Sequence, residues 1–541
     1  MSRRITLLLA AAALTSCTME PKLERPALPV PPSWPVGDAY LRQQEAALPS
    51  VSWRAVFRDQ RLQRIVEQAL ANNRDLRIAA ANIASARALY RIQRADLFPE
   101  VGVTGSFTRA RSGGATSIRT GGGLGSGTGV GTGTGVGNGG VGTGTGTGGT
   151  GTGAGTGTGT GVGAGTGGGV VSTGGSSRSV YSLQGGITNW EIDLFGRIRS
   201  LTDAAQRRYF GQEAAARATR LTLVGDLADA WLTYAADRTL MRIAEDTARS
   251  AEDSVRLTRA RLNGGVAPRT DLRQAEQILA TAQADLATQR TALAQDANLL
   301  QLLVGAPVDP ALLPASIEEA AATVGELPAG LDSTILLRRP DVVQAEYELR
   351  AVNAEIGAAR AALFPTISLT GVLGFASTAL SSMFSSDSFS WSVSPQARYS
   401  IFRAGAGVAN VRYSEAQRDA ALATYERAVQ SAFREVSDAL ARRGTIADEL
   451  AAQRRFRDAA LDTFQLTQAR YRGGIDTFLS SLDAQRSLYS AQRTLASTEL
   501  TRASNLVSLY RTLGGDQTLD ATPGGPVPLS PEDPPRSAPQ R

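Results

Sequence analysis

The residue types that most often carry catalysis and metal binding are nearly absent from this chain. Its 541 residues include no histidine and a single cysteine, Cys17. Ser/His/Asp and Cys/His catalysis, and metal sites built from histidine or cysteine, are therefore excluded by composition. Carboxylates are abundant, but they recur along helical surfaces, and no pair is set apart for acid–base work. We predict no enzyme activity, no catalytic residue, no cofactor and no metal site.

Charged residues do stand out beside two glycine pairs, Gly264–Gly265 and Gly473–Gly474, which interrupt helical patterns. Glycine is favoured where a helix ends, so each pair predicts the turn of a helical hairpin. Arg261 and Arg470 stand just before these turns, where they could contact a partner protein or simply face solvent. Asp476 follows the second turn, where it could cap the next helix, as aspartate often does.

The only cysteine follows a segment with the layout of a secretory signal. Residues 1–16, MSRRITLLLAAAALTS, contain an arginine pair and an apolar run too short to span a bilayer. Cys17 closes the sequence LTSC, which resembles the lipobox of bacterial lipoproteins. That resemblance implies cleavage before Cys17 and its acylation, with palmitate among the acyl groups, and Thr18 after it favours the outer membrane. The alternative is a plain signal peptide with an incidental cysteine.

The net charge is basic but does not indicate nucleic-acid binding. The chain carries 56 basic and 50 acidic residues, a formal charge of +6, and all but one of the basic residues are arginine. The arginines alternate with acids, as in RSAEDSVRLTRARL, which is typical of a solvated helix face. We therefore expect no nucleic-acid partner.

The sequence is an internal duplication. Residues 75–105 align without gaps on residues 341–371, with ten of 31 positions identical, and both segments contain LFP. Residues 257–283 align likewise on 466–492, with ten identities in 27. Self-similarity of this kind indicates two copies of one structural unit.

A glycine-rich tract interrupts only the first copy. Between residues 121 and 170, 28 of 50 residues are glycine. Such a segment has too few apolar side chains to bury, so burial cannot offset the entropy lost on ordering its backbone. Strand-like patterns flank it at 100–110 and 179–195, and their counterparts lie at 366–376 and 389–402. The tract is therefore predicted to be an insertion in the loop at the tip of a strand hairpin, where insertions are tolerated.

The remaining pattern is helical, and helix lengths predict how the helices pack. Apolar residues recur at spacings of three and four over 60–97, 198–262, 267–304, 333–363, 405–472 and 478–513. The helix at 198–262 would reach roughly 100 Å, about the length of two shorter helices laid end to end. Many alanines would permit close, coiled-coil-like packing.

Strand length and number predict the assembly. Strands of about ten residues match one bilayer crossing in a β-barrel. Four strands cannot close, and open sheet edges are not tolerated in lipid, so several chains must share one barrel. Two chains would give a barrel filled by side chains, whereas three would give about 12 strands and a conducting interior. We therefore expect a homotrimer.

With these features assembled, the sequence resembles the outer-membrane efflux protein family, the TolC-type channels of tripartite pumps, in its lipoprotein subfamily. The resemblance covers nearly the whole chain. It is carried by LTSC, the proline-rich LERPALPVPPSWP, both LFP sites, NWEIDLFGRIR and YRGGIDTFLSSLDAQRSLYSAQ. The glycine-rich loop is the departure, because it is much longer than the family's usual extracellular loop.

The resemblance implies a mainly α fold with a membrane β-barrel: a trimeric 12-stranded barrel, four strands per chain, continued by a long α-helical barrel and an equatorial belt. The segments would be a signal peptide at 1–16, a lipid-anchored segment with part of the belt at 17–59, a first repeat at 60–304 with an extracellular loop at 112–178, an equatorial linker at 305–332, a second repeat at 333–513 and a Pro/Gly-rich tail at 514–541.

The resemblance also implies a function and partners. The chain would be the outer-membrane channel that exports small molecules such as drugs, toxic compounds or metals, and it would extend from outer-membrane lipid into the periplasm. Its partners would be a periplasmic membrane-fusion adaptor and an inner-membrane RND-type pump. Adaptor contacts would involve Arg261, Arg470 and the two glycine pairs, and Asp476 would form an acidic ring at the periplasmic gate.

Two alternatives remain open at this point. A type I protein-secretion duct would show a similar lipoprotein signal and double repeat. A lipid-anchored structural protein or adhesin would also show long helices and low-complexity tracts, but it would not need strand pairs of membrane-spanning length in each half.

Overall fold

The computed structural model describes residues 19–23, 25–35, 37, 40, 52–111, 177–327, 333–515, 519–522 and 525–528. It consists of two compact units. The first comprises residues 1–100, 187–370 and 394–541, and the second comprises residues 101–186 and 371–393. Cys17, most of the glycine-rich loop and most of the C-terminal tail lie outside the described residues.

Helices dominate the first unit, and none of those described is long and apolar enough to cross a membrane. Their bounds are α2 Trp53–Val56, α3 Gln60–Asn72, α4 Arg74–Ala95, α5 Arg197–Asn263, α6 Arg269–Val304, α7 Ile317–Ala322, α8 Pro340–Ala361, α9 Ala406–Arg472 and α10 Phe478–Thr512, with the short 3-10 helices η1 Pro310–Leu312 and η2 Ser333–Arg338. The 3-10 helices η3 Leu380–Ser382 and η4 Ser386–Ser388 belong to the second unit.

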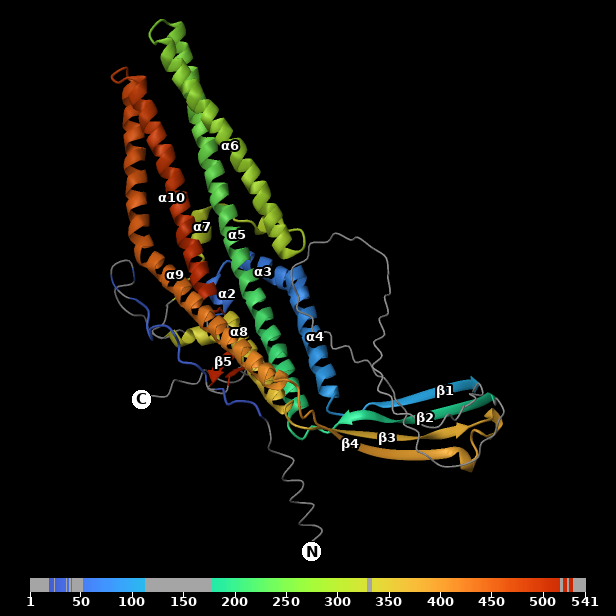
Figure 1. The fold of residues 1–541 in the computed structure, drawn as a ribbon. Helices are drawn as coiled ribbons and strands as arrows, with labels where there is room; N and C mark the ends of the chain where they lie inside the picture. The colour runs from blue at the N-terminus through green and yellow to red at the C-terminus, as the bar shows by residue number, and fades with distance from the viewer. Residues whose placement is uncertain are drawn as a thin grey trace, which may run out of the picture. The chain divides into compact units, whose positions relative to one another are not determined.

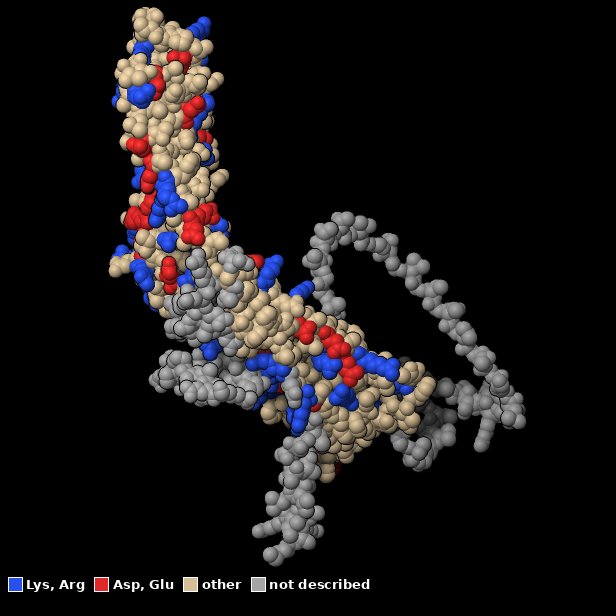
Figure 2. Space-filling model, turned by 90° about the vertical axis from the view of Figure 1, so that its left-hand side faces the viewer, with Lys and Arg blue, Asp and Glu red and all other residues tan. Residues whose placement is uncertain are grey.

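The two longest helices each pair with shorter ones along their length. α5 packs against α6 over one part and against α4 and α8 over another, while α9 packs against α10 and α8. This is the arrangement that the helix lengths predicted. α5–α6 and α9–α10 are helical hairpins whose turns lie at the same end (Figure 1). On the face shown in Figure 2, basic and acidic side chains are interspersed along the hairpins, without a basic stripe.

Two helix boundaries differ from the sequence prediction. The helix expected at 60–97 is broken at Asn73, whose backbone is extended and whose side chain accepts a hydrogen bond from the Leu76 amide (3.1 Å). The Asn73 side chain also donates to the carbonyl of Leu303 (2.8 Å), which draws it into the core. The helix expected from 333 starts as η2, and α8 begins at Pro340, where the fixed φ of proline favours the first helical position.

The largest core gathers the segments expected to form an equatorial belt. Trp231 of α5 is fully buried and donates from its indole nitrogen to the Leu312 carbonyl (3.1 Å). Phe57 and Val324, from the two segments that flank the first repeat, form an antiparallel bridge. β5 Leu519–Thr522 and β6 Gly525–Pro528 add a small antiparallel pair.

Four strands form one sheet in the order β1-β2-β3-β4. They are β1 Val101–Arg111, β2 Ser177–Glu191, β3 Thr366–Ser377 and β4 Phe389–Arg398. The four predicted strands are therefore present at nearly the predicted positions. Since β1 and β4 are the outer strands, each leaves one edge without a partner among the residues that the structure describes.

Candidate functional site

The two hairpin turns share one backbone geometry. At the first, the Gly265 amide donates to the Leu262 carbonyl (3.0 Å) and the Val266 amide to the Arg261 carbonyl (2.9 Å). At the second, the Gly474 and Ile475 amides make the same two bonds. This is the Schellman motif, which needs a left-handed residue, and Gly265 and Gly474 have φ of +74° and +73°. The glycine pairs are helix ends, as predicted.

Asp476, directly after the second turn, is held by an arginine rather than by a helix end. Nε of Arg470 donates to its carboxylate at 2.6 Å. This hydrogen bond lowers the pKa of Asp476 below its ordinary value, so the carboxylate is charged at neutral pH. The interpretation of Asp476 as a helix cap is wrong, because Thr477 is the N-cap and accepts from the Ser480 amide.

Arg261, the counterpart of Arg470 in the first hairpin, contacts the other hairpin instead. Its guanidinium donates to the backbone carbonyl of Tyr471 (3.3 Å) and lies 4.7 Å from the centre of the Tyr471 ring. Such a stacked arrangement gains cation–π attraction. The residue at the position matching Asp476 is Ala267, so Arg261 has no acid in its own turn. The arginine therefore joins the ends of the two hairpins.

An apolar cluster below the turns joins the same two hairpins. Its members come from four helices, so no local pattern in the sequence predicts it; they are Val255, Leu272, Ala275, Tyr471, Phe478 and Leu482. The rings of Tyr471 and Phe478 lie 5.3 Å apart. By contrast, Val266 and Ile475 at the turns are 72% and 69% exposed. Each turn therefore presents an apolar side chain to solvent above a buried contact.

Two aspartates face each other within the first hairpin and were not singled out by sequence. Asp237 of α5 and Asp296 of α6 are half-buried and lie close enough for their carboxyl groups to influence each other's pKa, and Oδ2 of Asp296 has no hydrogen-bond partner among the described residues. Burial, together with the charge of Asp237, raises the pKa of Asp296 to about 6. The pair is therefore protonated more readily than an exposed aspartate would be.

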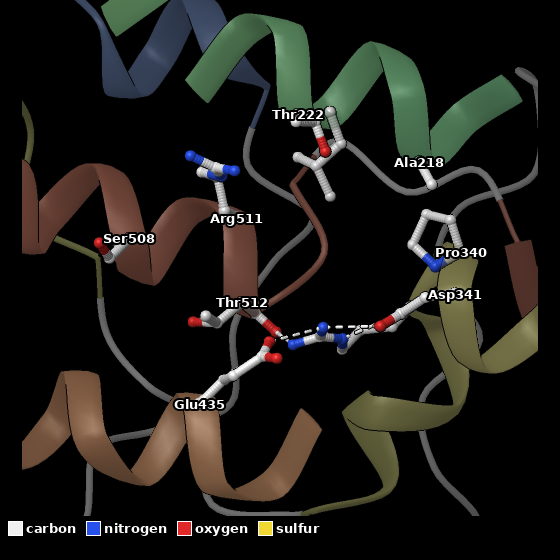
Figure 3. Close-up of a pocket in the computed structure, with 10 residues that line it drawn as sticks. Ala218, Thr222, Pro340, Asp341, Glu435, Ser508, Arg511 and Thr512 are labelled. Carbon is white, nitrogen blue, oxygen red and sulfur yellow. Dashed lines mark hydrogen bonds and ion pairs between the residues drawn. The ribbon is translucent and has the colours of Figure 1, made fainter. Parts of the chain in front are cut away.

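A polar pocket of about 390 Å³ lies among α5, α8, α9 and α10 (Figure 3). The guanidinium at its centre belongs to Arg339, which donates to Asp341, to Glu435 and to the Thr512 carbonyl. With all its bonds made inside the chain, this arginine has a structural role in joining three helices. Within the described part of the chain, no group of three or more His, Cys, Asp or Glu residues could hold a metal ion.

Comparison with known proteins identifies the family to which this chain is similar. The family model for outer membrane efflux proteins matches residues 65–137, 151–306 and 331–515. The antibiotic efflux pump outer membrane protein ArpC and the toluene efflux pump outer membrane protein TtgC, both of Pseudomonas putida, are each 39% identical to this chain over 513 residues, covering 94% of it and 95% of each relative.

A solved structure agrees with the sequence comparisons. The open state of the MtrE outer membrane channel of Neisseria gonorrhoeae superposes with a TM-score of 0.73 at 30% identity, covering 92% of this chain and 98% of that one. The chain is thus an outer-membrane component of a tripartite efflux system, with a mainly α fold and a strand region. It belongs to the outer membrane efflux protein family.

Proposed function

We propose that three copies of the chain form one conduit and that the conduit catalyses no reaction. In its described part, each chain supplies a sheet of four strands with an open edge on either side. Because unpaired backbone groups are costly in lipid, those edges must pair with neighbouring copies. Three chains would close a barrel of 12 strands. The observation that carries the proposal is the four-stranded sheet with its two open edges.

An exposed apolar face on α4 supports the trimer. None of its residues is buried in the single chain. Ile78, Leu89 and Ile92 are 58%, 60% and 65% exposed, and their spacing places them on one side of the helix. Exposed apolar faces of this extent mark interaction surfaces, and a second copy of the chain would cover this one.

The hairpin turns are the proposed contact with a periplasmic membrane-fusion adaptor, which in turn binds an inner-membrane RND-type pump. The exposed side chains of Val266 and Ile475 lie beside Arg261 and Arg470, so each turn combines an apolar contact with a guanidinium. The glycine pairs keep both turns short, which would let a partner approach the backbone closely.

Asp476 is the proposed gate residue. In a trimer, three carboxylates would face a narrow axis, where they would repel one another and attract cations. The Arg470 contact keeps each carboxylate charged at neutral pH. Bound cations would help to hold the periplasmic end closed.

The N-terminal segment supports a lipid anchor at Cys17, outside the described residues. Arg25 donates to Glu346 of α8 (2.9 Å), and the Pro21 carbonyl accepts from Asn353 (2.8 Å). The segment therefore runs along α8 toward the end that leads into β3. Cys17→Ser should abolish labelling by a radioactive fatty acid. Unchanged labelling of the variant would contradict the proposal that Cys17 is acylated.

The glycine-rich loop at 112–178 is the proposed extracellular tip of the first strand hairpin. β1 ends at Arg111 and β2 begins at Ser177, so the tract joins two paired strands. The segments 17–59, 60–304, 305–332, 333–513 and 514–541 remain our proposed division of the mature chain. Deleting residues 121–170 should leave trimer assembly intact, whereas failure to assemble would show that the tract is structural.

Small organic toxicants are the proposed cargo. The relatives named for antibiotic and toluene efflux support this class over proteins or metals. Conductance of the purified protein in planar bilayers tests the conduit, and a protein without conductance would contradict it. Increased susceptibility of a deletion strain to antibiotics and solvents, restored by the gene, tests the cargo.

A further inference from the structure

A small polar cavity lies where the N-terminal segment crosses α5 and α8. Its volume is about 240 Å³, and it is lined by Glu20, Pro21, Lys22, Leu23, Arg207 and Arg350. Pockets that enclose whole drug-sized ligands measure roughly 300–1,000 Å³. This cavity therefore suits a small charged group rather than an entire lipid or drug.

The cavity lining offers hydrogen-bond donors. Lys22, the only lysine of the chain, is exposed and forms no ion pair with any described residue. Arg207 contacts Asp203 through Nε alone (3.3 Å), and its two terminal nitrogens donate no hydrogen bond within the described ranges. Ammonium and guanidinium groups placed together in this way are the usual partners of a phosphate.

The lining also contains one acid, Glu20, which lies within electrostatic reach of Arg207 and Arg350. Glu20 is half-buried and accepts a hydrogen bond from Nδ2 of Asn353 (3.1 Å). Burial raises the pKa of Glu20 above its ordinary value, which shows that its charged form is costly there. The charges of Arg207 and Arg350 offset part of that cost, and a cationic group of a ligand would offset more of it. The carboxylate would at the same time repel an inorganic phosphate ion.

We propose that this cavity binds the headgroup of a zwitterionic membrane phospholipid, with its phosphate at Lys22 and Arg207 and its primary ammonium at Glu20. The lining carries charges of both signs, which match the opposite charges of phosphoethanolamine, and the acyl chains stay outside. The proposal rests on the lipid anchor proposed above, since Cys17 stands three residues before Glu20 and brings this segment to the bilayer surface.

Soluble headgroup analogues test the site without a membrane. Full-length protein in detergent is titrated with glycerophosphoethanolamine, glycerophosphocholine or inorganic phosphate, and binding is followed by phosphorus NMR line broadening. We expect glycerophosphoethanolamine to bind at least tenfold more tightly than the other two, because a methylated ammonium cannot donate to Glu20. Equal binding of all three would overturn the proposal, and tighter binding of phosphate would identify a simple anion site instead.

Substitutions test the basic and the acidic lining residues separately. Lys22→Gln and Arg207→Gln should each weaken glycerophosphoethanolamine at least tenfold, while Glu20→Gln should remove the preference over glycerophosphocholine. Arg256→Gln is the matched control, because it removes one positive charge from an exposed position of α5. The same weakening in the control, or none at Lys22, would refute the site. Fatty-acid labelling at Cys17 is measured separately, so failure of the anchor and failure of the cavity are distinguishable.

Discussion

The two helical hairpins share a backbone but differ in charge. α5 and α9 each contain 67 residues, and α9 begins and ends 209 positions after α5. Both end in the same glycine turn. At the first turn Ala267 stands where the second has Asp476, and farther down the helices Asp237 and Asp296 of the first hairpin correspond to Ile446 and Asn505 of the second.

This difference in charge gives the two turns different contacts. The backbone bonds that end a helix at a fixed angle are present in both copies, so the turns are held equally. The arginine of the second turn binds its own aspartate, whereas the arginine of the first binds the other hairpin. The second turn thus carries the charge proposed for the gate, and the first turn carries the link between hairpins.

Removing the acid unique to the second turn should have the largest effect. In a trimer, Asp476→Ala would remove three negative charges from a narrow axis, so block of the channel by a trivalent cation should weaken at least tenfold. Single-channel currents with and without the cation measure this. Asp271→Ala, which removes an acid near the first turn, is the control and should keep wild-type block. Identical block in wild type and Asp476→Ala would remove Asp476 from the gate.

The shared backbone predicts equal costs at the two turns. Gly265→Val and Gly474→Val should each destabilise the turn by about 1–2 kcal/mol, because a residue with a β-carbon is strained at positive φ. No neighbouring atom would contact an added Cβ at either site, so only backbone strain acts. Hydrogen exchange at the amides of Val266 and Ile475 measures the cost.

Gly473→Ala is the control for this pair, since Gly473 has a helical φ of −77° and an added Cβ would meet only ordinary contacts. It should leave exchange almost unchanged. A clearly larger cost at one turn than at the other would show that the two backbones are not equivalent.

Sequence patterns predicted the features that depend on residues close together along the chain. Periodicity located the helices and strands, and the glycine pairs located the turns. The break at Asn73 was missed because it depends on the Leu303 carbonyl, 230 positions away. Thr477 was missed as the cap because the Schellman turn extends through Ile475, which shifts the helix start past Asp476.

The charged contacts of the hairpins lay beyond sequence reasoning for the same reason. Arg261 and Tyr471 are 210 positions apart, and either arginine could have taken an acid or a carbonyl as its partner. Asp237 and Asp296 each resemble an ordinary solvated acid until the antiparallel pairing of α5 and α6 brings them together.

Breaking the link from the first turn should have a smaller effect. Arg261→Gln removes a charged hydrogen bond and a cation–π contact worth about 0.5–1 kcal/mol at an exposed site. Spin labels at Asn263 and Arg472 should then report a broader distance distribution between the hairpins. Arg259→Gln, whose arginine binds Glu276 within the first hairpin, should leave the distribution narrow. An unchanged distribution in Arg261→Gln would show that the apolar cluster alone joins the hairpins.

The smallest effect concerns pH and should be confined to the first hairpin. The folded-state pKa of Asp296 is about 6, above its ordinary value of 3.8, so the fold binds this proton more tightly than the unfolded chain does. Its contribution to stability is complete below about pH 4 and is lost as pH rises through about 6.

Since both carboxyl groups are partly exposed, solvent screening should limit the loss to less than about 1 kcal/mol. Amide protection factors along α5 and α6 should fall over this range and should fall less in Asp237→Asn, where burial still raises the pKa of Asp296 but its charged neighbour is gone. In α9 and α10 the corresponding residues are Ile446, which has no charge, and Asn505, which donates to the Ala439 carbonyl (2.9 Å), so protection there should not respond to this change of pH. A fall of equal size in both hairpins, or in the variant, would show that the carboxyl pair does not set the pH response.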